Sequence, residues 1–375
     1  MEREKFLENI EWLTRLKIRG SVGTSGNNNI GDYAAQGVYG YGSYNSESTA
    51  YPSRLPNPNL SWEKSMQTSV GFDASFFDSR LSVTFDLYKR KTTDLLLATR
   101  LSMTSGFSSR IDNVGEMENK GYELAISGDV IRTNDWTFSL NGMISQNKNK
   151  VLKLYEGNDI TIGWNSLVSE GHPINVYKMV RWAGVNPANG DALWYDKNGK
   201  ITNEFKEEDK VLIGKSCNAP WQGGFGTTLS WKGVTVSALF SWVADRYMMN
   251  NDRYFSENAA VYSSYNMSRR LLTDRWKKPG DMVTMPRYDV PMQFDDRILE
   301  DASFLRLKNL SVSYELPKNL LKPTKIIDRV RVFAQGQNLF TWTKFQGMDP
   351  ESTANYYQAA YPMSRQFSIG LEVSF

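Results

Sequence analysis

The sequence contains one cysteine, Cys217, and one histidine, His172, in 375 residues. A single cysteine excludes an internal disulfide, and these two residues cannot form the usual cysteine and histidine zinc clusters. No run of 18 apolar residues exists, which excludes a transmembrane helix. The 44 basic and 41 acidic residues are spread along the chain, so the net charge of +3 does not indicate a nucleic-acid partner.

A recognisable leader is also lacking. The residues from Met1 to Phe6 have no basic region followed by an apolar region, as a signal peptide would. An exported protein needs such a leader. We therefore expect that Met1 is not the natural start and that the chain is the carboxyl part of something longer.

What the sequence does have is alternation of apolar and polar residues. Aromatic residues make up 13% of the chain, although its mean hydropathy is negative, at −0.49. The final residues show the pattern most clearly, because every odd position from Phe367 to Phe375 is apolar and the even positions between them are small or polar. Successive side chains of a strand point to opposite faces, so this strand has one apolar and one polar face. A soluble sandwich or a transmembrane barrel would both fit a single such strand.

The pattern recurs along most of the chain. The clearest hairpin has alternating strands over 66–76 and 81–88, joined at Phe77 to Arg80. Further strands are predicted at 16–22, 124–130, 136–144, 225–231, 234–242, 304–316, 330–339 and 367–375. The apolar parity switches between Leu307 and Leu310, which indicates a β-bulge. Long strands of this kind favour an all-β fold, a transmembrane antiparallel β-barrel of which about 10–12 strands are present.

Short turns and long connections alternate in this pattern. The long connections, near 28–60, 146–175 and 244–298, are rich in Asn, Ser, Tyr, Asp and Gly. Such lengths are unusual in compact soluble domains but normal for the extracellular loops of outer-membrane barrels. We therefore expect residues 1–375 to form one barrel portion with these three segments as extracellular loops.

Several motifs resemble one family when their order and spacing are taken together. They are Leu16 to Gly23, Asn57 to Glu63, Asn113 to Glu123, Ala219 to Phe225, Ser303 to Asn309, Gln335 to Trp342 and Gly347 to Glu351. Over nearly the whole chain the sequence resembles the SusC/RagA-type TonB-dependent transporters of Bacteroidota outer membranes.

The resemblance implies a barrel of about 22 strands whose lumen is filled by an amino-terminal plug. The plug and about half of the strands are absent here, so the resemblance implies the carboxyl-terminal half of such a barrel. It also implies energised uptake of an oligosaccharide or peptide, with a SusD-like surface lipoprotein over the long loops and the TonB complex on the missing plug side. Two alternatives remain open: a soluble β-rich protein that binds or cleaves glycans, and a passive porin or structural barrel.

No residue pattern predicts catalysis or a cofactor. Asn186 to Asp191 and Asp196 to Lys200 contain oxygen ligands, but they lack the EF-hand spacing and are typical of hairpin turns. Acidic runs such as Glu207 to Asp209 are typical of solvated surfaces. His172 and Cys217 are expected in turns or loop entries, and a reactive role for the thiol has no support.

Aromatic side chains are the candidate contact residues. Those near strand ends are Trp62, Trp136, Trp231, Trp242 and Phe375, and we expect an interfacial belt rather than a sugar-stacking surface. In the loops, flat rings with hydroxyl tips suit glycans or peptides, and the candidates are Tyr39, Tyr41, Tyr44, Tyr51, Tyr254, Tyr262 and Tyr265. Phe375 is also a candidate signal for barrel assembly, because a terminal aromatic strand resembles the one that the assembly machinery reads.

Overall fold

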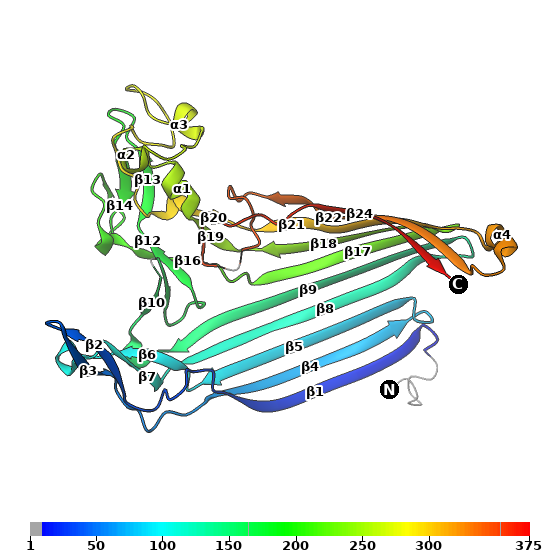
Figure 1. Ribbon diagram of the computed structural model, residues 1–375, viewed down its shortest axis with the longest axis horizontal. Helices are drawn as coiled ribbons and strands as arrows, with labels where there is room; N and C mark the ends of the chain where they lie inside the picture. The colour runs from blue at the N-terminus through cyan, green and yellow to red at the C-terminus, as the bar shows by residue number, and fades with distance from the viewer. Residues whose placement is uncertain (1–9, 164, 353) are drawn as a thin grey trace.

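The computed structural model describes residues 10–163, 165–352 and 354–375. Its main element is an antiparallel sheet of ten strands in the order β1-β4-β5-β8-β9-β17-β18-β21-β22-β24 (Figure 1). The bounds are β1 Leu13–Asn27, β4 Glu63–Phe76, β5 Leu81–Thr93, β8 Glu116–Arg132, β9 Trp136–Lys153, β17 Trp221–Trp231, β18 Val234–Ala244, β21 Phe304–Glu315, β22 Arg329–Thr343 and β24 Gln366–Ser374. The strand count and the antiparallel fold agree with the sequence-based prediction.

Directly opposed residues form rows that are apolar and polar in turn. One row crosses nine strands without a polar side chain: Leu16, Ala74, Val83, Ile126, Gly142, Phe225, Phe240, Leu307 and Phe340. The next row along the strands is Lys17, Asp73, Thr84, Ala125, Met143, Gly224, Ser241, Arg306 and Thr341. Since the two rows point to opposite faces, the pairing register gives the whole sheet one apolar and one mostly polar face.

The apolar face is uncovered. Ile18, Val22 and Ile369 are 60%, 68% and 85% exposed. Exposed apolar surface of this extent marks an interaction surface, and on a sheet that is polar on its other face the matching environment is lipid. Near the turns, Trp136 and Trp231 stack with ring centroids 5.2 Å apart, as expected for an interfacial belt.

Short turns join the strands at one end of the sheet. The turn from β4 to β5 places Phe77, Asp78 and Ser79 in the left-handed region, with φ between 53° and 63°. The turn from β17 to β18 uses Lys232 and Gly233 in the same way. The connection from β21 to β22 is longer and carries α4 (Lys318–Leu321) at this end (Figure 1). The predicted bulge is confirmed, because the pairing register shifts between Leu307 and Asn309.

The long connections gather at the opposite end, which we call the loop end (Figure 1). They are not irregular, because most of them fold into small sheets and helices. The small strands are β2 Val38–Tyr44, β3 Glu47–Arg54, β6 Leu96–Arg100, β7 Ser109–Asn113, β10 Ile160–Ile162, β11 Ser166–Val168, β12 Val176–Met179, β13 Arg181–Val185, β14 Ala192–Tyr195, β15 Ile201–Thr202, β16 Val211–Ser216, β19 Tyr247–Asn250, β20 Leu299–Asp301 and β23 Tyr356–Tyr357. The helices are α1 Asn251–Ser256, α2 Ala259–Tyr262 and α3 Arg270–Thr273. The long connection predicted to begin at residue 146 begins later, because β9 continues to Lys153.

The main buried core also lies at the loop end. It consists of Tyr177, Met179, Cys217, Met249, Met292 and Ile298. These residues come from β12, β19 and the connections that follow β16 and α3, so the core fixes segments from different loops against one another. Among the described residues, no helix is long and apolar enough to cross a membrane.

An arginine at Ile126 should destabilise the sheet in its membrane. Ile126 pairs with Gly142, six residues along β9 from Trp136. That separation is about 20 Å along the strand, and strand tilt reduces it to a depth of about 15 Å, near the middle of an apolar band about 25 Å tall. Ile126→Arg is therefore expected to cost about 2–4 kcal/mol.

The measurement is the heat-modifiable fraction of the full-length protein on a gel after urea titration. The matched control is Ser127→Arg, because the neighbouring residue points to the polar face. Equal effects of the two substitutions would contradict the assignment of the faces.

Candidate functional site

The first tyrosine group lies on the hairpin of β2 and β3 at the loop end. Tyr39 and Tyr41 lie on one face of the hairpin, whereas Tyr44 and Tyr51 lie on the other by strand parity. The Tyr51 ring covers Gly40 and Gly42, where an added Cβ would come within 3.1 and 3.2 Å of it. Tyr41 is 86% exposed. The four rings are thus split between two faces, and their contact with ligand stays a prediction.

The second tyrosine group packs against itself. Tyr254 stacks on Phe294 with centroids 3.9 Å apart, and Tyr262 stacks on Tyr265 at 5.3 Å. Burial raises the pKa of the Tyr254 hydroxyl, so that this group stays protonated well above neutral pH. Tyr265 is the most open of the three, at 54% exposure. A ligand-contacting role for these residues also stays a prediction, as does the assembly role of Phe375, which is 79% exposed.

A cavity that the sequence did not predict lies beside the core. It has a volume of about 390 Å³ and is lined mainly by amide and aromatic side chains. The lining residues are Ile162, Gly163, Asn165, Ser166, Tyr177, Met249, Asn251, Asn355, Tyr356 and Gln358. We call it the amide pocket. Among the described residues that line it none is charged, so it suits a neutral ligand with hydrogen-bonding groups.

Two amide oxygens in this pocket have no partner within the described residues. They are the Oδ1 atoms of Asn165 and Asn251, whose side chains are 5% and 1% exposed. The Asn251 amide nitrogen donates to Gln358 Oε1 at 3.0 Å, whereas that of Asn165 reaches only the Met249 sulfur at 3.6 Å. A buried acceptor without a donor costs about 1–3 kcal/mol. Both oxygens are enclosed by the protein in this structure, and a ligand with N–H or O–H groups would supply the kind of donor that they lack.

Tyr177 organises the wall of the pocket. Its hydroxyl donates to the backbone oxygens of Tyr247, at 3.2 Å, and of Asn355. Burial raises the pKa of this hydroxyl far above its ordinary value, so it acts as a donor at every physiological pH. Asn355 in turn donates to Ser166 Oγ at 3.1 Å. The pocket therefore joins the β10–β11 hairpin, β12 and the loop after β22.

Two arginines hold the loop after β22, which we call the β22 loop (residues 344–352 and 354–357). Arg306 of β21, 2% exposed, donates to Asp349 Oδ1 at 2.5 Å and to Glu351 Oε2 at 2.7 Å. Arg246 donates to the backbone oxygens of Cys217, Pro350 and Ser352. Burial lowers the pKa of Arg246, although not enough to discharge a guanidinium. Two of the motifs noted in the sequence, 303–309 and 347–351, thus meet through a buried ion pair.

Sequence reasoning missed this pocket because its residues are far apart along the chain and lie in connections. Asn165, Asn251 and Asn355 occur in the connections between strands, where polar residues are typical of solvated loops. The alternation of apolar and polar residues locates strands, but it carries no signal for contacts between loops. A usable signal would have been three asparagines next to short apolar runs, at Leu167, Met249 and Tyr356.

The fold and the pocket together define a class. A long-stranded antiparallel sheet with an uncovered apolar face, a polar opposite face and an aromatic pair near the turns is the wall of a large transmembrane β-barrel. The folded loops at one end add a cavity.

Comparisons with known proteins place the chain within that class. The family model for the TonB dependent receptor-like beta-barrel matches residues 9–339. Over its whole length the chain is 31% identical to TonB-dependent receptor P3 of Formosa agariphila and 29% identical to TonB-dependent receptor SusC of Bacteroides thetaiotaomicron, covering 41% and 39% of those proteins. The structure of the RagAB peptide transporter matches with a TM-score of 0.91 and 35% identity, over 99% of this chain and 42% of that one.

The chain belongs to the TonB-dependent receptor β-barrel family and is of the SusC/RagA type. It spans about two fifths of the length of the relatives it matches. The predictions of the family, of the barrel fold and of an outer-membrane location are confirmed, and the location excludes the soluble alternative. Proteins of this family are transporters and are typically not enzymes.

Proposed function

We propose that the protein imports a peptide or an oligosaccharide across the outer membrane in a TonB-dependent, energised step. In this proposal the ten strands form part of the barrel wall, and the amide pocket binds a neutral segment of the cargo at the loop end. The observation that carries the proposal is the pair of buried, unpartnered oxygens of Asn165 and Asn251. Peptide N–H groups and sugar hydroxyls are the donors that such acceptors require.

A peptide is the preferred cargo. A peptide backbone offers a donor and an acceptor at each residue, and the pocket offers both in its asparagine and glutamine side chains. The similarity to the RagAB peptide transporter supports the same choice. An oligosaccharide is the second cargo class, since hydroxyl groups meet the same requirement.

The proposal assigns one partner to each end of the sheet. A SusD-like surface lipoprotein would sit on the loop end, where the folded connections form a broad platform (Figure 1). The TonB complex would act from the turn side, through a plug domain. The similarity to the RagAB peptide transporter supports the first partner, and family membership supports the second.

Replacing Asn165 with leucine tests the proposal. Its Nδ2 makes one long contact to sulfur and its Oδ1 makes none, so an apolar side chain of the same shape leaves stability unchanged or higher. Loss of one hydrogen bond to the cargo should weaken binding by about 5- to 10-fold. The measurement is the concentration dependence of uptake of labelled peptides, and separately of labelled oligosaccharides, by cells that carry the full-length transporter.

Asn198→Leu serves as the control, because Asn198 lies in the exposed turn between β14 and β15. Wild-type half-saturation for both cargo classes in the Asn165→Leu cells would contradict a role for the amide pocket. A change confined to oligosaccharides would reassign the cargo.

A further inference from the structure

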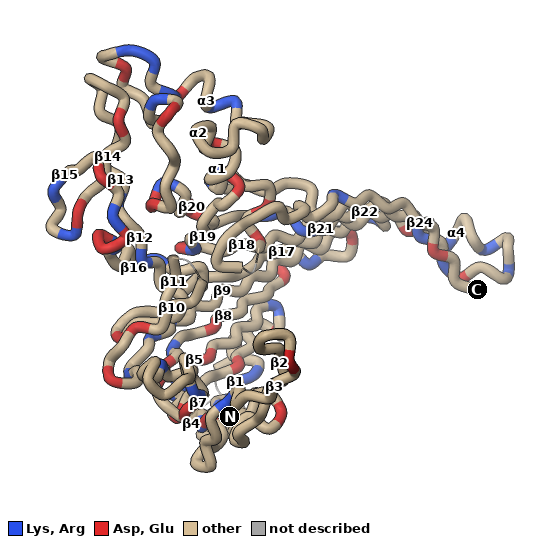
Figure 2. Tube along the Cα trace, turned by 60° about the vertical axis from the view of Figure 1, so that its left-hand side comes forward, with Lys and Arg blue, Asp and Glu red and all other residues tan. Residues whose placement is uncertain are grey.

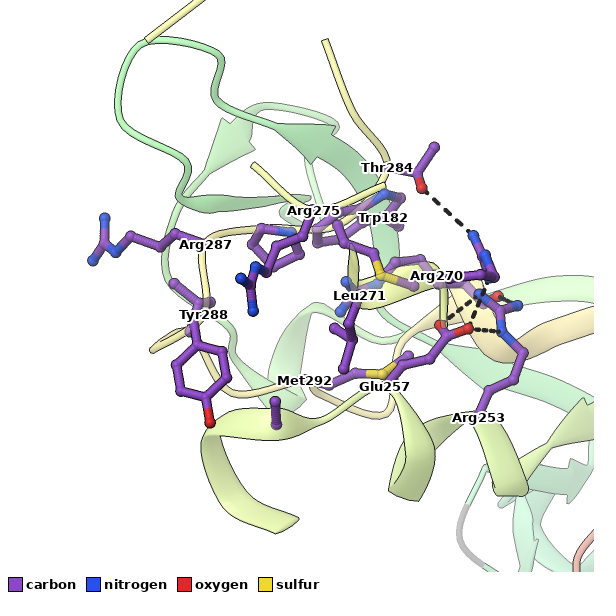
Figure 3. A pocket seen from close by; sticks show the side chains of 15 residues that line it. Trp182, Arg253, Glu257, Arg270, Leu271, Arg275, Thr284, Arg287, Tyr288 and Met292 are labelled. Carbon is purple, nitrogen blue, oxygen red and sulfur yellow. Dashed lines mark hydrogen bonds and ion pairs between the residues drawn. The ribbon is translucent and has the colours of Figure 1, made fainter. Parts of the chain in front are cut away.

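A second cavity lies in the part of the loop end that we call the outer lobe, residues 181–202 and 251–298. It has a volume of about 230 Å³, and five arginines line it: Arg253, Arg270, Arg275, Arg287 and Arg297. Figure 3 labels Arg253, Arg270, Arg275 and Arg287 around the opening, and Glu257 is the carboxylate among its labelled residues. The floor is apolar, because it is formed by Leu271, Met285 and Met292. Each of these residues is no more than 8% exposed.

Four of the five arginines have carboxylate partners. Arg253 pairs with Glu257 and Glu300 at 3.0 and 2.7 Å. Arg270 pairs with Glu257 at 2.8 Å and Asp274 at 3.2 Å. These two guanidinium groups therefore belong to one ion-pair network on one side of the cavity, joined by Glu257, as the dashed lines in Figure 3 show.

The remaining pairs lie at the edges of the cavity. Arg287 pairs with Asp191 and Asp289, and its side chain extends away from the others in Figure 3. Arg297 pairs with Asp295 at 2.7 Å. Figure 2 likewise shows basic and acidic residues interspersed through the outer lobe. Neighbouring carboxylates thus neutralise the charge of four of the five guanidinium groups.

Arg275 differs from the other four. Within the described residues it has no carboxylate partner, and its guanidinium lies 5.0 Å from the centroid of the Tyr288 ring. Figure 3 shows it directed into the space between Tyr288 and Leu271. Its backbone is fixed by a bridge to Met285, with neighbouring hydrogen bonds of 3.0 Å on both sides. A half-buried cation held in place above an apolar floor is arranged to meet an anion.

We propose that this cavity binds the carboxylate of an acidic peptide, with Arg275 as the residue that receives it and Leu271, Met285 and Met292 as the surface beneath its apolar part. The role in import rests on the proposed function, whereas the binding itself does not.

Helix α1 connects this cavity to the amide pocket. Its first residue, Asn251, lines the amide pocket, and Arg253 lines the arginine-lined cavity. Glu300 joins them further, since it accepts from Asn250 Nδ2 at 3.3 Å and from Arg253 Nη1 at 2.7 Å. One helix of six residues therefore contributes to the walls of both cavities.

The experiment is calorimetric binding to the full-length transporter purified in detergent, with N-acetyl-leucine and N-acetyl-leucine amide as probes. The two probes share their apolar part and differ in the carboxylate. We expect the acid to bind at least about tenfold more tightly than the amide. Arg275→Gln should lower the affinity for the acid to that for the amide, and it should leave the affinity for the amide unchanged. Arg275→Lys, which keeps the charge but loses the planar fork, should retain part of the preference.

Arg181→Gln is the matched control. Arg181 also lies 5.0 Å from a tyrosine ring, that of Tyr195, but it does not line the cavity. Equal affinities of acid and amide for the wild type, an acid preference that survives Arg275→Gln, or an equal loss in Arg181→Gln would each overturn the proposal. Peptide uptake through the amide pocket is measured separately with Asn165→Leu, so failure here leaves that result intact.

Discussion

Replacing Arg306 with methionine is expected to destabilise the β22 loop by about 3–5 kcal/mol. Arg306 is 2% exposed and holds Asp349 and Glu351 at 2.5 and 2.7 Å. Methionine fills a similar volume but leaves Asp349, 6% exposed, as a charge without its cation. The measurement is hydrogen exchange of residues 344–352 in the full-length protein, compared with strands of the main sheet.

The control for this prediction is an exposed ion pair of the same type. Arg329 and Glu372 lie 2.5 Å apart on neighbouring strands, with side chains 45% and 42% exposed. Because solvent screens such a pair, Arg329→Met should change stability by about 0–1 kcal/mol. Adding Asp349→Asn to Arg306→Met should restore part of the loss, since it removes the uncompensated charge. If the β22 loop were as well protected from hydrogen exchange in Arg306→Met as in the wild type, the role assigned to the Arg306–Asp349 pair would be wrong.

The same pair gives the loop a pH dependence. Burial raises the pKa of Asp349, but hydrogen bonds from the Met363 and Glu351 amides and from Arg306 outweigh it, and the net pKa lies below the ordinary 3.8. A carboxyl whose folded pKa is lowered stabilises above its unfolded pKa and loses this stabilisation as pH falls through the folded value. Protection of the β22 loop should therefore be constant at neutral pH and fall below about pH 3.8.

The second large effect is expected for Asp295→Ala in the outer lobe. Asp295 is fully buried, accepts from Trp194 Nε1 at 2.8 Å and forms two contacts of 2.8 and 2.7 Å with Arg297. Its removal leaves the Arg297 guanidinium, 10% exposed, without its carboxylate. Losing one partner of a buried pair costs about 3–5 kcal/mol. Hydrogen exchange of residues 181–202 should report the loss.

Asp289→Ala is the control within the same lobe, because Asp289 pairs with Arg287 at 2.8 Å but is 71% exposed. We expect at most about 1 kcal/mol from it. If the two substitutions had equal effects on exchange in the outer lobe, Asp295 would not be the residue that holds β13 and β14 in place. The main sheet should keep its protection in both variants.

The sequence predicted the wall of the barrel far better than its loop end. Strand periodicity is fixed by the requirement for lipid on one face and polar groups on the other, so Phe72, Phe85 and Leu124 reveal their shared face without knowledge of the fold. Even the bulge near Asn309 left a parity change in the sequence.

The loop end carries no such periodicity. Asp295 and Trp194 lie 101 positions apart, and Arg306 and Asp349 lie 43 apart. Their contacts depend on how separate connections pack, which local pattern does not encode. The tyrosines were visible in the sequence, but whether a ring is free or stacked, as Tyr254 is on Phe294, depends on the same packing.

Arg246 holds its neighbours in a way that tolerates sequence change. All three of its hydrogen-bond acceptors are main-chain oxygens, those of Cys217, Pro350 and Ser352. Every amino acid supplies that oxygen, so a new side chain at position 352 leaves the anchoring acceptor in place. The side chains of this loop can therefore be exchanged while the path of the main chain stays the same.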